Sequence, residues 1–272
     1  MRCAPAPVEL PYTEIAPPAD LAPYVDRLWL RTTVRGVPGH VHRVLPDGCV
    51  DVIVHADRGS AELVGAMTRA IEVPDAPAEL VAVRFKPGTA AAVAGCTLAA
   101  LTDRSIDLAD LNIAGALADR VGDAGRCAVA TSLPARLPLS ATAYARLAAL
   151  IAWLRRRLAD AAPPDPRIAH AVTRLSAGAR IDQVAGELGV TRQHLARGFR
   201  TEVGVTPKQL ARTARMQRAV TAIGRGGELA RVAVELGYFD QAHLANDLRA
   251  LAGITPAAIA AERPIALSHL FG

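Results

Sequence analysis

One segment of this chain occurs a second time further along, and this repeat limits what the chain can fold into. The first copy reads ELGVTRQHLARGF from Glu187, and the second reads ELGYFDQAHLANDL from Glu235. The copies align at an offset of 48 residues as far as Gly189 and Gly237, and at an offset of 49 after one residue is inserted in the second copy. Such self-similarity indicates that one small structural unit occurs twice. The identical positions, numbered in the first copy, are Val184, Ala185, Glu187, Leu188, Gly189, His194, Leu195, Ala196, Arg200, Gly204, Thr206 and Pro207.

Each copy has the signals of two short helices joined by a tight turn. An amphipathic segment, near 181–188 in the first copy and 229–236 in the second, ends at a Leu-Gly pair whose glycine can take the left-handed backbone that closes a helix. Thr191 and Asp240 follow, and their side-chain oxygens can cap the first amides of a new helix. Two helix-turn-helix units are therefore predicted. Their second helices are expected near 191–201 and 240–251.

The second helix of each unit is predicted to bury one stripe and to expose a polar face. Leu195 and Phe199 form the stripe in the first unit, and Leu244, Leu248 and Leu251 form it in the second. The exposed residue types are those that hydrogen-bond base edges in a major groove, where Arg pairs with guanine and Gln or Asn pairs with adenine. A merely polar surface is the alternative, but two such faces in matched contexts favour DNA binding. The candidate DNA-binding residues are Arg192, Gln193, His194, Arg197, Arg200, Gln241, His243, Asn246 and Arg249.

A helical stretch joins the two copies and begins at Pro207, where the missing amide costs nothing. At about 17 residues it would be roughly 25 Å long, so it could hold two recognition helices in successive major grooves about 34 Å apart. Arg212, Arg215 and Arg218 recur along it at every third residue. Arg215 could contact phosphate or could instead be a buried residue that braces the fold. The candidate phosphate-contacting residues are Arg212, Arg218, Thr191 and Asp240.

The net charge of +5 lies entirely in the C-terminal part of the chain. Residues 165–272 hold 14 Lys and Arg against 9 Asp and Glu, whereas residues 1–164 hold 17 of each. This asymmetry favours a polyanionic partner for the repeat region.

The front half has the pattern of an α+β unit. Short β-rich runs (LWLRTTV, CVDVIVH and LVAVRF) alternate with turn signals, one of which is the turn at 46–48. Helical segments are expected near 88–100 and 112–120, and a longer helix follows whose apolar seam suits packing on the sheet or on a second copy of the chain. The predicted fold is α+β: a β-rich N-terminal domain (1–138), a connecting helix with a Pro-rich linker (139–164), and an all-α domain with two helix-turn-helix units (165–263).

The repeat region resembles the DNA-binding domain of the AraC/XylS family of bacterial transcription regulators. The matching motifs are VAGELGV, HLARGFRTEVGVTPKQL, RMQRA and ELGYFDQAHLANDLRALAGITP. Departures from the family pattern are Leu248 in place of an aromatic residue, Gly198 within the first recognition helix, and Asn246 in place of a basic residue. The resemblance implies a sequence-specific activator or repressor whose partner is double-stranded DNA, with RNA polymerase as a further partner.

The front half resembles a small N-terminal domain found ahead of this unit in some family members, through the motifs HRVLPDGCVDVIV, LVGAMTR and VRFKPG. In family terms such a domain serves in sensing a small-molecule effector, in forming a homodimer, or in both.

An enzymatic or metal-binding front half is the alternative. His40 and His42 with Asp47, and His55 nearby, could hold a divalent metal ion, and Cys49 could be a reactive thiol. The spacing lacks an established metal motif, and the chain shows no nucleophile triad, phosphate loop or carboxylate pair. The prediction is therefore a protein that is not an enzyme, with no catalytic residues, no metal and no cofactor.

Two further features concern location. Four well-separated cysteines without a CxxC pair are expected to be buried free thiols. The chain has no apolar run long enough to cross a membrane and no apolar core of a signal peptide near its start. A cytoplasmic location without membrane contact is the expectation.

Overall fold

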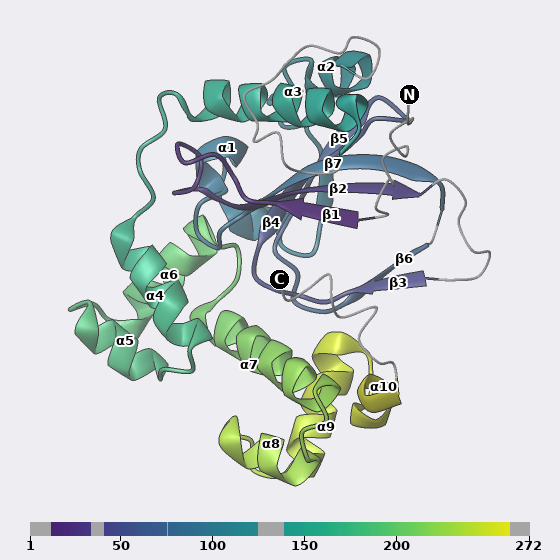
Figure 1. Cartoon of the computed structure of the whole chain (residues 1–272). Helices are drawn as coiled ribbons and strands as arrows, with labels where there is room; N and C mark the ends of the chain where they lie inside the picture. Colours follow the sequence, from purple (N-terminus) through teal and green to yellow (C-terminus); the bar gives the residue numbers. More distant parts are fainter. Residues whose placement is uncertain (1–11, 34–40, 75, 125–138, 262–272) are drawn as a thin grey trace.

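The computed structural model describes residues 12–33, 41–74, 76–124 and 139–261 (Figure 1). Its N-terminal part contains a six-stranded antiparallel sheet in the order β1-β2-β7-β4-β5-β8 and a two-stranded sheet formed by β3 and β6. The strands of the larger sheet are β1 (Tyr12–Ile15), β2 (Val25–Thr33), β7 (Ala78–Phe85), β4 (Val50–His55), β5 (Ser60–Val64) and β8 (Ser105–Asp107). The smaller sheet pairs β3 (Val41–Val44) with β6 (Ile71–Pro74).

One face of the larger sheet is apolar and covered by helices. The strict alternation of VDVIVH in β4 buries every second residue, as expected for a strand with one face in the core. Leu28, Val83 and Val52 stand side by side across three strands and are fully buried. Above them lies α3 (Ala141–Leu158), with α2 (Leu117–Ala124) beside it, while β3 and β6 lie on the other side of the sheet (Figure 1).

The predicted turn at 46–48 is present and belongs to a polar cluster on the second face of the sheet. Asp47 accepts a hydrogen bond from the amide of Cys49 at 2.8 Å, and Gly48 takes a left-handed conformation with φ +78°. The guanidinium of Arg84 pairs with Asp47 at 3.5 Å and with Asp51 at 3.2 Å. All three side chains are largely buried, so the turn is fixed to the sheet by charge.

The connecting helix packs on its own sheet. Ser140 caps it, and its seam residues Leu147, Ile151 and Leu154 are buried in the core beneath it. The apolar seam that could have served a second copy of the chain is therefore occupied within the chain.

The expected helices near 88–100 and 112–120 are shorter than predicted. The first is split into α1 (Ala91–Ala94) and a 3₁₀ helix (Leu98–Leu101), because the left-handed Gly95 ends α1. The second begins only at Leu117, because Asn112 and Gly115 also have positive φ angles.

The C-terminal part is all helical, which confirms the predicted α+β fold class with its segregated helices. The connecting stretch forms one helix, α7, that begins at Pro207 and is capped by Thr206. It runs from the group α4, α5 and α6 to the group α8, α9 and α10 (Figure 1). The bounds are α4 (Pro166–Ser176), α5 (Ile181–Glu187), α6 (Arg192–Glu202), α7 (Pro207–Gly224), α8 (Leu229–Glu235), α9 (Gln241–Ala252) and α10 (Pro256–Ala261).

The buried apolar side chains of the described residues form two hydrophobic cores. The larger is continuous from the sheet through α3 into the first helix-turn-helix unit, where it contains Leu175 and Phe199. The smaller lies in the second unit around Val220, Leu244 and Leu248, and Leu45 from the N-terminal part joins it. The N-terminal part is thus packed against both units.

Hydrogen bonds reinforce this packing just before α7, within α7 and on α9. The hydroxyl of Thr102 donates to the carbonyl oxygen of Gly204 at 2.6 Å. The Gln217 side-chain amide donates to the carbonyl oxygen of Pro46 at 2.9 Å, and the Ala70 amide donates to the carbonyl oxygen of Leu251 at 2.7 Å. The N-terminal part is therefore tied to the end of the first unit, to α7 and to the second unit.

A comparison of two glycines tests how tightly the turn presses on α7. Gly48 and Gly59 both have positive φ angles, but a Cβ at Gly48 would lie 2.5 Å from Leu210 Cδ1, whereas none of the described atoms lies within 4 Å of one at Gly59. Gly59→Ala is expected to lose about 1–2 kcal/mol of unfolding free energy through backbone strain alone. Gly48→Ala should lose a further 1–3 kcal/mol, about the cost of overpacking a core. Chemical denaturation measures both, and equal losses would contradict a tight contact.

Candidate nucleic-acid interface

The first recognition helix is α6, and it matches the predicted segment closely. The hydroxyl of Thr191 accepts a hydrogen bond from the His194 amide at 3.1 Å, which confirms the predicted cap. Leu195 and Phe199 are buried as expected. All five side chains proposed for this face are exposed: Arg192, Gln193, His194, Arg197 and Arg200.

The second recognition helix, α9, repeats this arrangement. The carboxylate of Asp240 accepts a hydrogen bond from the His243 amide at 2.7 Å, and Leu244, Leu248 and Leu251 are buried. The glycines that close the preceding helices, Gly189 and Gly237, have φ angles of +64° and +73°. All four side chains proposed for this face are exposed: Gln241, His243, Asn246 and Arg249.

A buried carboxylate, Asp247, holds α9 to α7. It is 4% exposed and accepts a hydrogen bond from Arg212 Nε at 2.5 Å and from the Tyr238 hydroxyl at 3.2 Å. Arg215 Nη2 lies 3.7 Å from the same carboxylate, and its guanidinium lies 4.3 Å above the Tyr238 ring. Burial, together with the charge of Asp247, raises the pKa of Tyr238 to about 12. Arg215 therefore braces the packing of α9 on α7, which was one of its two predicted roles.

Sequence reasoning missed Asp247, although its position carried a signal. It lies on the apolar stripe of α9, next to Leu248 and three residues after Leu244, where a polar residue is unusual. A charged residue at such a position needs a buried partner, and the arginines spaced along the preceding helix are the nearest candidates.

The cations of α7 are more engaged with the protein than the sequence suggested. Arg218 donates to the carbonyl oxygen of Ala177, just beyond the end of α4, at 3.3 Å. Arg212 pairs with Asp247 but keeps 41% of its side chain exposed. Lys208, which was not among the sequence candidates, is exposed near the start of α7. A hollow of about 470 Å³ opens between α7 and α9, lined by Lys208, Arg212, Arg215, His243, Asn246, Asp247 and Ala250.

The first unit is braced differently, by an ion cluster nearer the surface. Glu187 accepts hydrogen bonds from Arg174 at 2.8 Å, from His170 at 3.0 Å and from Gln183 at 3.0 Å. The hydrogen bond from Arg174 contributes most to a pKa of about 2 for Glu187. Its counterpart in the repeat, Glu235, pairs with Arg231 at 3.6 Å.

The alternative residues of the N-terminal part do not converge. His40 lies outside the described residues, and His42 lies on β3, whereas Asp47 pairs with Arg84 and His55 pairs with Glu62 at 2.8 Å. Within the described ranges, no three His, Cys, Asp or Glu side chains are grouped so as to hold a metal ion. Cys49 and Cys96 are free thiols. Burial raises the pKa of the Cys49 thiol well above its usual value, which disfavours the reactive thiolate.

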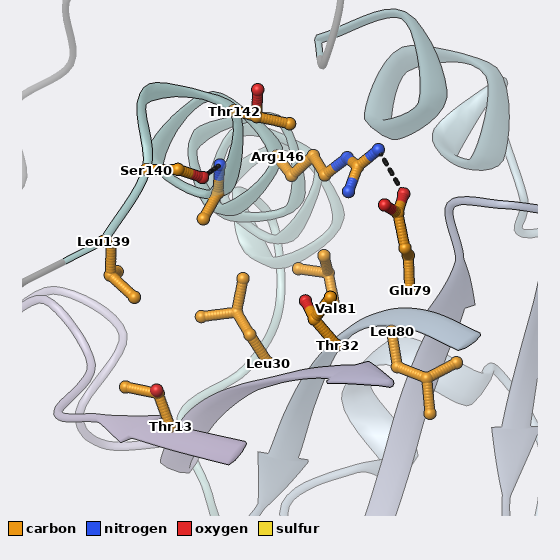
Figure 2. Close-up of a pocket in the computed structure, with 11 residues that line it drawn as sticks. Thr13, Leu30, Thr32, Glu79, Leu80, Val81, Leu139, Ser140, Thr142 and Arg146 are labelled. Atoms are coloured by element: carbon orange, nitrogen blue, oxygen red, sulfur yellow. Dashed lines mark hydrogen bonds and ion pairs between the residues drawn. The ribbon is translucent and has the colours of Figure 1, made fainter. Parts of the chain in front are cut away.

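A cleft of about 220 Å³ separates the start of α3 from the sheet (Figure 2). Leu30 and Val81 point up from the strands toward the helix, and Arg146 reaches from α3 to Glu79, with which it pairs at 2.7 Å. Arg146 is 15% exposed. Among the residues that the structure describes, its Nε atom has no hydrogen-bond partner.

Comparison with known proteins identifies both parts of the chain. Residues 184–262 match a family described as a helix-turn-helix domain, and residues 13–107 match a domain of unknown function (DUF6597). The chain carries an AraC-type helix-turn-helix domain. This result confirms the resemblance seen in the repeat, and a helix-turn-helix domain of this type supports DNA binding and transcription regulation.

Solved structures give distant likenesses, and no curated protein matches the chain. An apo variant of ToxT from Vibrio cholerae is 11% identical, with 85% of this chain and 96% of that one covered at a TM-score of 0.40. ToxT from the same organism with an unsaturated fatty acid bound is 11% identical, with 84% and 92% covered at 0.38. The xylose-binding transcription activator xylR is 17% identical, with 49% of this chain and 43% of that one covered at a TM-score of 0.32.

In the described part of the chain, no helix has the length and apolar character needed to cross a membrane.

Removing the charge of Asp247 tests the brace within the AraC-type domain. Asp247→Asn is expected to lower the unfolding free energy by about 2–3 kcal/mol, the upper range for hydrogen bonds to charged groups. The matched control is Asp182→Asn, which breaks an exposed pair with Arg192 and should cost less than about 1 kcal/mol. Chemical denaturation distinguishes the two, and similar losses would show that Asp247 does not brace α9.

Proposed function

We propose that this protein is a sequence-specific transcription regulator whose helices α6 and α9 read two successive major grooves on one side of double-stranded DNA. The supporting observation is that every side chain predicted to contact bases is exposed, while the opposite stripe of each helix is buried. The two helices belong to units at opposite ends of α7, whose 18 residues span about 27 Å. That length suits two grooves about 34 Å apart.

The two reading faces differ in the bases that they suit. The first presents Arg192, Arg197 and Arg200, and arginine pairs best with guanine. The second keeps one arginine, Arg249, and otherwise presents Gln241 and Asn246, which pair best with adenine. Base contacts of this kind supply discrimination, while contacts to phosphate fix the register on the duplex.

The phosphate contacts come from the groups around these helices. Arg212 and Arg218 remain candidates for contacting phosphate, because part of each guanidinium is not bonded to the protein. Lys208 is a further candidate. Thr191 and Asp240 remain candidates because they lie at helix N-termini, where amide groups attract phosphate. We keep 165–263 as the DNA-binding domain, 139–164 as the connecting segment and 1–138 as the sensing or dimerisation domain.

The cleft beneath α3 is the proposed site of a small-molecule effector. Arg146 is the one cation among its described lining residues, which include Leu30, Val81 and Leu139. Glu79 also lines the cleft and pairs with Arg146, but the Arg146 Nε atom has no hydrogen-bond partner among the described residues. A carboxylate with a short apolar body would complement this lining through that Nε atom, because guanidinium groups bind carboxylates with charge-assisted hydrogen bonds. At about 220 Å³, the cleft is smaller than drug-sized sites of roughly 300–1,000 Å³, which favours a small metabolite. RNA polymerase and a second copy of the chain are the further proposed partners.

Single substitutions on each reading face test the proposed DNA recognition. Arg197→Ala and Gln241→Ala should each cost roughly 1–3 kcal/mol of specific binding and relax the preference at one base pair. The sequences selected from a random DNA library by each variant measure this effect. Arg155→Ala is the control, because it removes one charge from α3, where Arg155 pairs with Asp20, and should leave the preference unchanged. If Arg197→Ala and Gln241→Ala both select the wild-type sequences, the assigned reading faces are wrong.

The salt dependence of binding supplies a second control for these variants. For about six neutralised phosphates, the logarithm of the binding constant should fall with the logarithm of salt concentration with a slope near −5. The slope should be unchanged in Gln241→Ala, because that side chain carries no charge. A slope near zero in the wild type would contradict groove binding.

The cleft is tested by thermal unfolding with a panel of small carboxylic acids. An acid at a hundredfold excess over its Kd should stabilise the wild type by about 2.7 kcal/mol, which raises the Tm by roughly 5–10 °C in a chain of this size. Arg146→Met should abolish the shift, whereas Arg155→Met, which removes a more exposed arginine of the same helix, should retain it. A shift that persists in Arg146→Met would exclude the cleft as the site.

A further inference from the structure

The two copies of the repeat differ by one inserted residue, and that residue is Phe239. Gly189 matches Gly237, and the caps Thr191 and Asp240 match each other. Between them the first copy has one residue, Val190, and the second has Tyr238 and Phe239. Tyr238 is buried like a core residue, so Phe239 is the extra position.

Phe239 is also the most exposed large apolar side chain of the described residues. It is 90% exposed, ahead of Val234 at 74%. Leaving a phenylalanine in water forgoes the gain that its burial would bring.

The neighbours of Phe239 keep it facing outward. On one side, Tyr238 is held in the core by its hydrogen bond to Asp247 and by Arg215 above its ring. On the other side, Asp240 is committed to capping α9. The backbone amide of Phe239 itself donates to His243 Nδ1 at 3.3 Å. The side chain is therefore displayed by a fixed backbone rather than by a loose loop.

The Phe239 side chain lies at the end of α9 that would enter the groove. Phe239 immediately precedes the cap of the helix, and the exposed Gln241 and His243 follow within four residues. In helix-turn-helix proteins, the N-terminal residues of the recognition helix contact the base edges. The 5-methyl group of thymine is the apolar feature of the major groove, and phenylalanine is among the side chains that contact it.

We propose that Phe239 reads a thymine methyl group in the half-site bound by the second unit. The inference rests on the proposed function, since it requires α9 to lie in a major groove. It adds that thymine is recognised by an apolar contact in one half-site only, because the first unit has no counterpart of Phe239. The partner is DNA rather than protein, because the surrounding exposed side chains are those of the reading face.

Replacing single thymines by uracil in a selected DNA site tests this proposal, because uracil lacks only the 5-methyl group. At one position in the half-site of the second unit, uracil should weaken wild-type binding about fourfold, the value of one buried methyl group. Phe239→Ala should bind thymine and uracil equally at that position. Val234→Ala removes the other exposed apolar side chain of this unit and should keep the wild-type response.

The outcomes separate this proposal from the proposed function. If the wild type selects a DNA site but no uracil substitution matters, or if Phe239→Ala keeps the same response, Phe239 does not read a methyl group while the regulator stands. Equal weakening of Phe239→Ala on all sequences, with the methyl response retained, would instead indicate a wedge or a backbone contact. If no DNA site is selected at all, both ideas fail. Thermal unfolding should show an unchanged Tm for Phe239→Ala, because its side chain buries little surface.

Discussion

The arrangement of α6 and α9, the two proposed reading helices, depends on the buried carboxylate of Asp247. Both units pack on α7, which contributes Leu210 to the larger core and Val220 to the smaller one. Apolar contacts alone would leave α9 some freedom to slide along this helix. Hydrogen bonds are directional, so the bonds that Asp247 accepts from Arg212 and Tyr238 fix one register. The position of α9 relative to α6 is thereby fixed through α7.

The N-terminal part shares in setting this geometry, since it contacts the end of the first unit, α7 itself and the second unit. Thr102 bonds to the end of the first unit, and the turn at Pro46 accepts a hydrogen bond from Gln217. The same turn is held to the sheet by Arg84, and α3 leads directly through the linker to α4. A ligand that altered the packing of α3 on the sheet would therefore act on both units at once, which is a physical route from the proposed effector cleft to the proposed DNA-binding surface.

Local features of the C-terminal half could be predicted from the sequence, because short-range rules decide them. The caps Thr191 and Asp240, the closing glycines and the start of α7 at Pro207 each depend on a few adjacent residues. The bracing by Asp247 and the contacts of the N-terminal part with both units depend on residues far apart in sequence. The periodicity of apolar residues therefore could not predict them. The short helices after residue 90 were missed because Gly95 and Asn112 adopt left-handed backbone, which apolar periodicity does not report. The roles of individual side chains on DNA remain predictions.

The repeat also shows why identity between the copies says more about fold than about recognition. The identical residues include Leu195 with its counterpart Leu244 and the closing glycines, which build each unit. The reading positions are conserved only in part: His194 and Arg200 match His243 and Arg249, whereas Arg192 and Arg197 correspond to Gln241 and Asn246. Even the buried Asp247 corresponds to Gly198, so each unit is braced in its own way. If both faces read DNA, this divergence requires two unlike half-sites, one richer in guanine contacts and the other in adenine contacts. A single chain with two unlike readers defines a direction on the duplex without any need for a symmetric partner.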